Sequence, residues 1–263
     1  MMTPRFSISI VSHGHGKYIE RLIEDLIRLN RSDIEVILTL NLPESFSFDL
    51  PALPFDLRVI KNDRIKGFAR NHNSAFAISR GENFVILNPD IKLCDDPFDV
   101  MLATLHDNPH SICAPLIVNK QNKVEDSARN FPSPVLLVKR LLSRIFHFSL
   151  PLEVLTVRGD VIVPDWVAGM FMVVPREIYH RLNGLSERYH MYFEDVDLCA
   201  RARLAGYQVL VNQRVSVIHE AQRDSHRKLR YLSWHIQSAV KFFTSSAYLK
   251  ISANRLRANM LRK

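Results

Sequence analysis

Residues 6–29 read FSISIVSHGHGKYIERLIEDLIRL. In the first six, small polar side chains separate apolar ones, a pattern that is typical of a strand. Gly14 and Gly16 follow, and from Tyr18 to Leu29 apolar residues recur at helical spacing. The stretch therefore predicts a strand, a glycine loop and a helix.

The same alternation continues along the chain. A helical segment is expected from Gly67 to near Gly81, and compact apolar runs predict further strands at 34–40, 57–61, 83–87 and 112–118. Farther on, we expect a strand-like run over 165–174 and short strands at 207–210 and 215–218. Strands that alternate with helices favour an α/β fold with a mainly parallel sheet, whose ligands gather at the carboxyl ends of the strands.

Composition is that of an ordinary globular protein. Of 263 residues, 47% are hydrophobic and 24% charged, which favours a single folded domain. The cysteines Cys94, Cys113 and Cys199 lie far apart, which argues against a disulfide framework or zinc site and favours a reducing cytoplasm. Because no apolar run reaches the roughly 18 residues of a spanning helix, we expect a cytoplasmic protein, soluble or peripheral at the inner face of the cell membrane.

The formal net charge of +8 is concentrated at one end of the sequence. Residues 220–263 contain 10 Lys/Arg against 2 Asp/Glu, with aromatic residues interleaved. Such a tail fits anionic lipid headgroups, nucleic acid or a solvated helical face. No nucleic-acid-binding motif accompanies the charge, so a nucleic-acid partner is not expected. Residues 134–150 are also basic and amphipathic, as in an interfacial helix or a core helix with a basic outer face.

Residues 191–197, MYFEDVD, place three carboxylates where a helical pattern begins. Glu194 and Asp195 would lie at the helix N-terminus, where the backbone N–H groups favour a charged carboxylate. Two interpretations stay open: the acids cap the helix, or they perform acid or base chemistry. Asp197 is expected to form bonds within the fold.

Other polar or aromatic residues follow predicted strands or open them. Asp90 comes directly after Pro89 at a strand end, which suits a metal or nucleotide contact as well as a simple turn. His219 ends a strand and suits a metal ligand or a polar terminus. Trp166 and Gly169 suit a flat surface for a sugar ring with close backbone approach, or core packing.

Taken together, these segments resemble glycosyltransferase family 2, the inverting enzymes with a GT-A fold, and within it the bacterial rhamnosyltransferase-like branch. The resemblance covers about residues 5–245. It rests on the strand end at Ser12, the segment around Gly67, the Leu87-Asn88-Pro89-Asp90 sequence, the run that begins at Trp166, and Met191 to Cys199.

The resemblance implies roles for particular residues. Asp195 is expected as the general base with Glu194 beside it, and Asp90 and His219 are expected to hold a divalent cation, Mn²⁺ or Mg²⁺, on the donor diphosphate. The donor would be bound by Ser12, Asn41, Gly67, Arg70, Asn71 and Asp90. The acceptor would be bound by Trp166, Gly169, Met170 and Phe171.

The sequence also departs from the family pattern. The acid that recognises the nucleotide base in relatives aligns with Leu40, followed by Asn41, and the first loop reads His13-Gly14-His15-Gly16 where relatives tend to have Tyr-Asn. Uridine and thymidine donors therefore both stay open.

The resemblance further implies a catalytic domain over 1–219, with a nucleotide-binding half at 1–118 and an acceptor and catalytic half at 160–219, before the basic helical tail. We expect an inverting, metal-dependent transferase that moves a sugar, such as rhamnose from dTDP-rhamnose, to a glycan or lipid-linked acceptor in bacterial surface polysaccharide synthesis. The alternative is a catalytically weak nucleotide- or glycan-binding scaffold in the same pathway.

Overall fold

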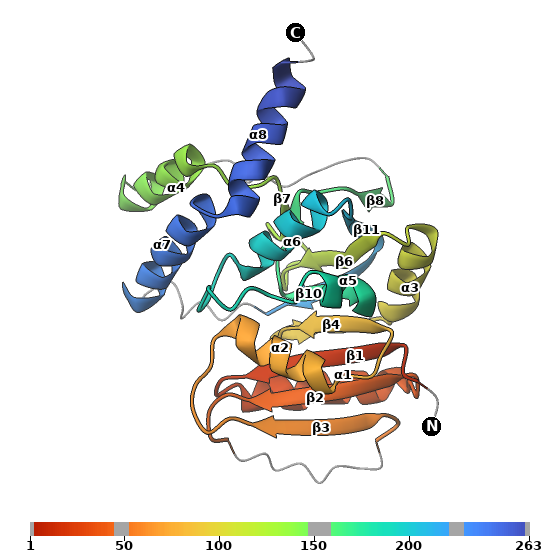
Figure 1. Ribbon diagram of the computed structural model, residues 1–263. Coiled ribbons are helices and arrows are strands. Elements are labelled where there is room, and N and C mark those ends of the chain that lie inside the picture. The colour runs from red at the N-terminus through yellow and green to blue at the C-terminus, as the bar shows by residue number, and fades with distance from the viewer. Residues whose placement is uncertain (1–2, 45–52, 147–158, 221–228, 261–263) are drawn as a thin grey trace.

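The structure is a computed structural model that describes residues 3–44, 53–146, 159–220 and 229–260. A mixed sheet runs through the molecule in the order β3-β2-β1-β4-β10-β6-β11-β5, with β8 paired to β11 (Figure 1). Its strands are β1 (Phe6–Ser12), β2 (Ile34–Leu40), β3 (Asp56–Lys61), β4 (Asn83–Leu87), β5 (Ile91–Lys92), β6 (Ser111–Val118), β8 (Val161–Ile162), β10 (Phe171–Pro175) and β11 (Gln208–His219). A separate small sheet joins β7 (Ala128–Arg129) to β9 (Trp166–Val167).

The described helices include some that pack on both faces of the main sheet and three that lie at one end of the molecule. They are α1 (Gly16–Leu29), α2 (Phe68–Ile78), α3 (Phe98–Asp107), α4 (Pro134–Phe146), α5 (Arg176–Arg181), α6 (Glu194–Leu204), α7 (Leu229–Phe243) and α8 (Ser246–Met260). Buried side chains of α1 and α3 share one hydrophobic cluster with the sheet, and those of α2, α5 and α6 share a second. The core therefore lies on both sides of the strands.

Four neighbouring strands, β3, β2, β1 and β4, are parallel, which confirms the mainly parallel α/β sheet. Strands β2 and β4 are buried along their whole length, as expected of strands covered on both faces. Beyond them, β10 is antiparallel to β4 and β6, and β11 runs parallel to β6. The carboxyl ends of the parallel strands share one edge, where the loops at 12–16, 41–44 and 88–90 begin.

Two strand predictions are wrong in detail. The run at 165–174 forms two strands, β9 and β10, because at the turn over 168–170 the Gly169 N–H donates to the Asp195 side chain and not to a neighbouring strand. The short strands expected at 207–210 and 215–218 are the single strand β11, with a bulge between Asn212 and Ser216. The polar residues there stay in the strand because the Asn212 side-chain oxygen accepts a hydrogen bond from the Arg214 N–H at 2.9 Å.

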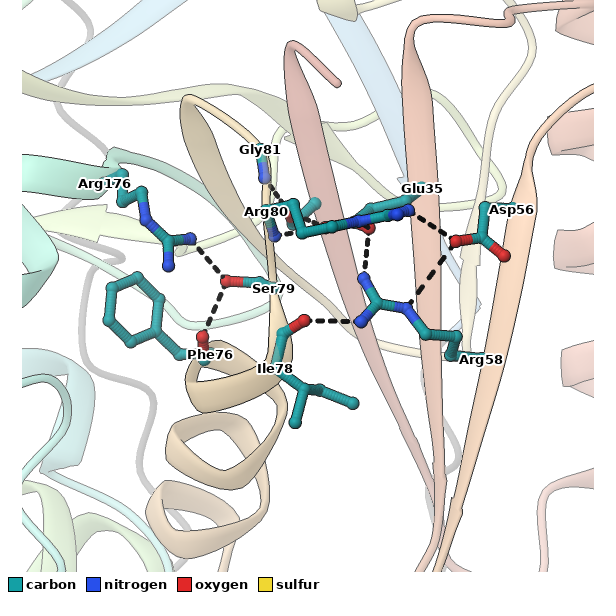
Figure 2. A network of polar contacts seen from close by, with 10 residues as sticks. Glu35, Asp56, Arg58, Phe76, Ile78, Ser79, Arg80, Gly81 and Arg176 are labelled. Atoms are coloured by element: carbon teal, nitrogen blue, oxygen red, sulfur yellow. Dashed lines mark hydrogen bonds and ion pairs between the residues drawn. The ribbon is translucent and has the colours of Figure 1, made fainter. Parts of the chain in front are cut away.

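An ion-pair network lies at the amino end of β2, at the other end of this strand from the loop at 41–44. Figure 2 shows its side chains. Glu35 is fully buried and accepts hydrogen bonds from the Ser7 hydroxyl at 2.5 Å and the Arg80 backbone N–H at 2.6 Å. The guanidinium groups of Arg58 and Arg80 also pair with it. Burial by itself raises the pKa of Glu35, but these hydrogen bonds and charges outweigh it and lower the pKa. The network ties β1, β2 and β3 to the loop after α2.

The basic segments are helical where the structure describes them. The segment expected at 134–150 forms α4 as far as Phe146, and its last residues lie outside the described chain. The tail forms α7 and α8, while 221–228 and 261–263 lie outside. Figure 1 shows α4, α7 and α8 at the end of the molecule opposite β3. No helix in the described part of the chain is long and apolar enough to cross a membrane.

Candidate active site

Asp90 and His219 lie side by side at the edge formed by the strand ends. Asp90 follows β4, and His219 is the last residue of β11, where it pairs with Ile91 of β5. His219 Nε2 is 3.3 Å from Asp90 Oδ2. The other carboxylate oxygen, Oδ1, is buried and has no hydrogen-bond partner among the described residues. The structure thus brings together the two residues expected as metal ligands.

Glu125 orients this pair, and sequence reasoning missed it. Its Oε2 accepts a hydrogen bond from His219 Nδ1 at 2.7 Å, and its own N–H donates to the Ile117 carbonyl at 2.9 Å. Burial by itself lowers the pKa of His219, but the Asp90 and Glu125 carboxylates outweigh it and raise the pKa to about 9. No sequence signal marks Glu125, because it lies in a polar loop 94 residues before the histidine.

The Asp90 carboxylate oxygen without a partner fits a divalent cation such as Mn²⁺ or Mg²⁺. The neighbouring His219 Nε2 would become a second ligand once the ion displaces its proton. Asp90 and His219 are the two side chains that would hold it. No cluster of three or more His, Cys, Asp or Glu residues suited to a metal occurs in the described parts of the chain. Oxygens of a donor diphosphate would supply further ligands.

The turn that precedes α6 is strained. Tyr192 and Phe193 have φ values of 70° and 67°, in the left-handed region that non-glycine residues rarely adopt. Such strain persists only where packing holds it, and here the Phe193 ring lies 5.5 Å from the Phe242 ring of α7, between centroids. The turn places Glu194 and Asp195 in the first turn of α6, as the sequence predicts.

The Asp195 carboxylate points toward the turn between β9 and β10. Its Oδ2 accepts a hydrogen bond from the Gly169 N–H at 3.0 Å, and its Oδ1 accepts one from the Val196 N–H at 2.8 Å. Burial raises the pKa of Asp195, and these N–H groups oppose the increase. The residue keeps partial exposure. A partly exposed carboxylate with a raised pKa is suited to accept a proton.

The two neighbouring acids differ from Asp195. Glu194 is buried, its Oε2 has no hydrogen-bond partner among the described residues, and burial together with the Asp195 charge raises its pKa. Asp197 accepts hydrogen bonds from the Tyr189 hydroxyl at 3.2 Å and from Arg201 Nε at 2.7 Å. Asp197 therefore bonds within the fold, as expected.

The turn at 168–170 connects Asp195 with the Asp90 segment. Directly after Gly169, the Met170 carbonyl accepts a hydrogen bond from the Asn88 N–H at 2.8 Å. Asn88 is two residues before Asp90. The catalytic candidate and the metal pair are thus joined through one short piece of backbone.

The aromatic residues expected to bind the acceptor lie in two different environments. Trp166 is half-buried, donates its indole N–H to the Asn130 carbonyl at 3.0 Å, and lies 5.5 Å below the Arg129 guanidinium. The positive charge of Arg129 also acts to lower the pKa of Asp195. Phe171 is fully buried in the core. The Phe171 side chain therefore does not reach the candidate active site, whereas Trp166 lies beside that site.

Asparagines form a network at the ends of β2 and β3. Asn41 accepts a hydrogen bond from the Asn62 side chain at 3.0 Å and donates one to the Lys66 carbonyl at 2.9 Å. Asn62 also donates to Asn71 at 2.7 Å. The structure thus brings Asn41 and Asn71, both expected to bind the donor, into one network that fixes the loop before α2.

Glu44 was not anticipated from the sequence. Its carboxylate accepts hydrogen bonds from the Ser12 hydroxyl at 2.8 and 2.9 Å and from the Gly14 N–H at 2.7 Å. It also lines a pocket of about 430 Å³ at the strand ends, together with Leu40, Leu42, Pro43, Lys61 and Asn62. An acid is therefore present at this edge of the sheet. It lies four residues after Leu40, and Leu40 is the position at which the family pattern has an acid.

Gly67 and Arg70 lie at the start of α2. A Cβ added at Gly67 would come within 2.7 Å of the His190 carbonyl oxygen, so only glycine allows this close approach. The Phe68 N–H donates to the same oxygen at 3.2 Å. Arg70 is exposed, and its Nε lies 4.0 Å from a Glu187 carboxylate oxygen. Gly67 thus joins α2 to the segment before α6.

Sequence comparison matches residues 7–162, more than half of the chain, to the family described as "Glycosyl transferase family 2". Rhamnosyltransferase WbbL of Escherichia coli (strain K12) is 28% identical, over 92% of this chain and 94% of its own length. The N-acetylglucosaminyl-diphospho-decaprenol L-rhamnosyltransferase of Mycobacterium tuberculosis (strain ATCC 25618 / H37Rv) is 24% identical, over 92% of this chain and 84% of its own.

Solved structures share the fold at low identity. GalNAc-T7 with UDP, GalNAc and Mn²⁺ has a TM-score of 0.63 at 14% identity, over 83% of this chain and 44% of its own. S. aureus TarS 1–349 with UDP-GlcNAc has a TM-score of 0.61 at 13% identity, over 92% of this chain and 67% of its own. Mannosyltransferase PcManGT from Pyrobaculum calidifontis with GDP-Man and Mn²⁺ has a TM-score of 0.58 at 15% identity, over 91% of this chain and 65% of its own. With the GT-A fold and the family match in agreement, this chain belongs to glycosyl transferase family 2 and resembles its rhamnosyltransferase branch.

Proposed function

We propose that this glycosyltransferase moves a sugar from a nucleotide donor to a glycan or lipid-linked acceptor, with inversion at the anomeric carbon and with a divalent metal ion. One observation carries the proposal. The Asp195 carboxylate and the Asp90–His219 pair lie at the same edge of the sheet, connected through the turn at 168–170. A single displacement needs both a base for the acceptor hydroxyl and a site for the donor diphosphate.

Asp195 acts as the general base in this proposal. The acceptor hydroxyl attacks the anomeric carbon from the face opposite the nucleotide, and its proton passes to the Asp195 carboxylate. The nucleoside diphosphate leaves with the electron pair of its bond to the sugar. Hydrogen bonds from Gly169 and Val196 fix the direction of the carboxylate. A positioned base typically contributes about 10² to 10⁴-fold to the rate.

Asp90 and His219 hold Mn²⁺ or Mg²⁺ in this proposal. When bound, the ion neutralises negative charge on the departing diphosphate. Glu125 keeps the His219 ring oriented through Nδ1. Two structures with the same fold, those of GalNAc-T7 and PcManGT, were solved with Mn²⁺, which supports a divalent ion here.

The donor proposed is dTDP-rhamnose, since the relatives from E. coli and M. tuberculosis are both named as rhamnosyltransferases. We place the nucleoside in the pocket that Glu44 and Asn62 line, near the network of Asn41 and Asn71. Ser12, Gly67 and Arg70 complete the proposed donor side.

The acceptor proposed is lipid-linked, because the mycobacterial relative is named for a diphospho-decaprenol substrate. Trp166, Gly169 and Met170 form the proposed acceptor side, next to Asp195. A lipid-linked acceptor places the reaction at the inner face of the cell membrane, in the synthesis of a surface polysaccharide, with the enzyme bound peripherally.

A donor panel tests the proposal. The protein is incubated with dTDP-rhamnose, UDP-sugars or GDP-mannose, with Mn²⁺ or Mg²⁺, and with N-acetylglucosaminyl-diphospho-polyprenol. We expect transfer from dTDP-rhamnose alone, a product of inverted configuration by NMR, and no transfer after chelation of the metal. Transfer with retained configuration, or equal transfer in the presence of a chelator, would contradict the mechanism.

A further inference from the structure

Three helices expose apolar side chains in regular stripes. On α4, the residues Val135, Val138, Leu142 and Phe146 follow one another at three or four positions and are 65%, 54%, 40% and 70% exposed. This spacing places them along one side of the helix. Helices α7 and α8 also expose apolar residues, namely Ile236, Val240, Leu249, Leu256 and Met260. Isolated exposed apolar residues are ordinary, but repeated stripes mark a surface that is covered in use.

The same helices account for the whole net charge of the protein. Residues 134–146, 229–243 and 246–260 contain eight Lys/Arg and no Asp or Glu, which leaves the rest of the chain with 27 residues of each sign. Lys139, Lys250 and Arg257 are exposed. A surface that combines apolar stripes with unbalanced cations is complementary to a bilayer that carries anionic headgroups.

The inner side of α7 contacts the strained turn before the proposed base. The Ser238 hydroxyl donates to the Met191 carbonyl at 2.8 Å, and Lys241 Nζ donates to the Arg188 carbonyl at 2.8 Å. The His235 ring lies 5.3 Å from the Tyr192 ring, between centroids. A partner that binds the outer side of α7 would therefore be separated from the segment that positions Asp195 by this helix alone.

We propose that the end of the molecule formed by α4, α7 and α8 docks on an anionic phospholipid bilayer. Its apolar stripes enter the boundary of the acyl chains, and its cations face the lipid phosphates. The inference rests on the proposed function only in that a lipid-linked acceptor would be met at this surface.

Vesicle flotation of the full chain tests the proposal. At low ionic strength we expect the protein to float with vesicles of phosphatidylcholine and phosphatidylglycerol, and to remain unbound with phosphatidylcholine alone. High salt should release most of it, because screening weakens the attraction between cations and headgroups. Equal binding to both vesicle types, or no binding to either, would overturn the proposal.

Paired variants locate the surface. We expect Val138→Ser with Phe146→Ser, and separately Lys250→Gln with Arg257→Gln, each to lower vesicle binding about 10-fold. Val163→Ser is the matched apolar control, because Val163 is 56% exposed but lies outside the three helices. Arg181→Gln with Arg214→Gln is the charge control, because both residues are exposed elsewhere. If the helix variants bind vesicles as the wild type does, this end is not the docking surface.

A soluble assay separates this inference from the proposed function. Transfer to a short water-soluble acceptor should be the same in the helix variants as in the wild type, and circular dichroism should show unchanged thermal unfolding. If the wild type fails to bind the anionic vesicles while its transfer to the soluble acceptor persists, the docking inference alone is wrong. If the wild type does not bind vesicles but forms a dimer that the helix variants dissociate, the surface belongs to a second copy and the inference is overturned.

Discussion

At the scale of single residues, the site depends on how each carboxylate is surrounded. Asp195 receives two backbone N–H groups and remains accessible, whereas its neighbour Glu194 is buried with one oxygen unpaired among the described residues. Asp197 is engaged with Arg201. The sequence places all three acids in one helical turn, but only their contacts distinguish the proposed base from its neighbours.

The raised pKa of Asp195 predicts the acidic side of the pH profile. A protonated Asp195 cannot accept the hydroxyl proton, so kcat/KM should fall as the pH drops through the pKa of this group. Because burial raises that pKa, the fall should begin at a higher pH than for an ordinary aspartate. The measurement is kcat/KM against pH with saturating metal. A profile that stays flat down to the ordinary pKa of aspartate would contradict this prediction.

Glu125 should influence metal binding through His219. We expect Glu125→Ala to weaken the affinity for Mn²⁺ in the presence of dTDP by about 10 to 100-fold, because the imidazole loses the acceptor that fixes its orientation. Glu125→Gln keeps an acceptor oxygen, so its affinity for Mn²⁺ should fall less. Calorimetry of Mn²⁺ binding measures the effect, with Glu177→Ala at an exposed surface position as control. Unchanged affinity in Glu125→Ala would show that the contact has no orienting role.

At the scale of elements, α7 and the start of β2 have different roles, one at the catalytic turn and the other in the stability of the sheet. Helix α7 contacts the strained turn at 192–193, and the Glu35 network closes the amino ends of β1, β2 and β3. The first is expected to affect the rate of reaction, and the second the stability of the fold.

Ser238→Ala removes the hydrogen bond from α7 to the Met191 carbonyl. Loss of one such bond corresponds to about 1 kcal/mol, so we expect kcat to fall about 5-fold while the KM for the donor stays unchanged. Gln237→Ala, at an exposed position on α7, is the control. A change confined to the thermal midpoint, with normal kcat, would mean that Ser238 stabilises the protein without positioning the catalytic turn.

Glu35→Ala should lower the free energy of unfolding by about 3 kcal/mol at neutral pH, because the Ser7 hydroxyl and the Arg80 N–H lose their buried acceptor. Arg58 and Arg80 then keep only Asp56 as a shared acidic partner. The pKa of Glu35 is lowered in the folded state. Its ionised form therefore stabilises the protein above the unfolded pKa, and this contribution is lost as the pH falls through the folded pKa. Urea unfolding at several pH values should show the difference from wild type shrinking below about pH 4. The exposed Glu24→Ala should show no such trend.

The sequence was sufficient for elements that periodicity marks clearly. Strands β1, β2 and β4 and the start of α6 lie where apolar patterns place them. It failed where side chains compensate for a break in pattern. The polar residues of the β11 bulge stay in the strand through the Asn212 side chain, and the turn at Gly169 interrupts an apolar run because Asp195 binds its N–H.

At the scale of the whole molecule, the site depends on contacts between distant segments. Asp90 and His219 could be predicted as residues at strand ends, because motif and resemblance mark them. Glu125 and Glu44 could not, since each lies in a loop without periodicity, and only the fold brings them to His219 and Ser12.

Since one proposed metal ligand follows β4 and the other ends β11, donor binding should depend on both the ion and the intact fold. Calorimetry should show dTDP binding that requires Mn²⁺ and is lost in Asp90→Ala. Asp107→Ala, exposed at the end of α3, should bind as the wild type does. Metal-independent binding of glycan without transfer would favour a scaffold over an enzyme.

Asp195→Asn gives the sharpest test of Asp195 as the general base of an inverting transfer. The amide keeps the size of the side chain but cannot accept the proton. With dTDP-rhamnose, Mn²⁺ and the lipid-linked acceptor, we expect single-turnover transfer to slow by about 10² to 10⁴-fold while dTDP affinity is retained. Transfer at the rate of the wild type would show that Asp195 is not the base.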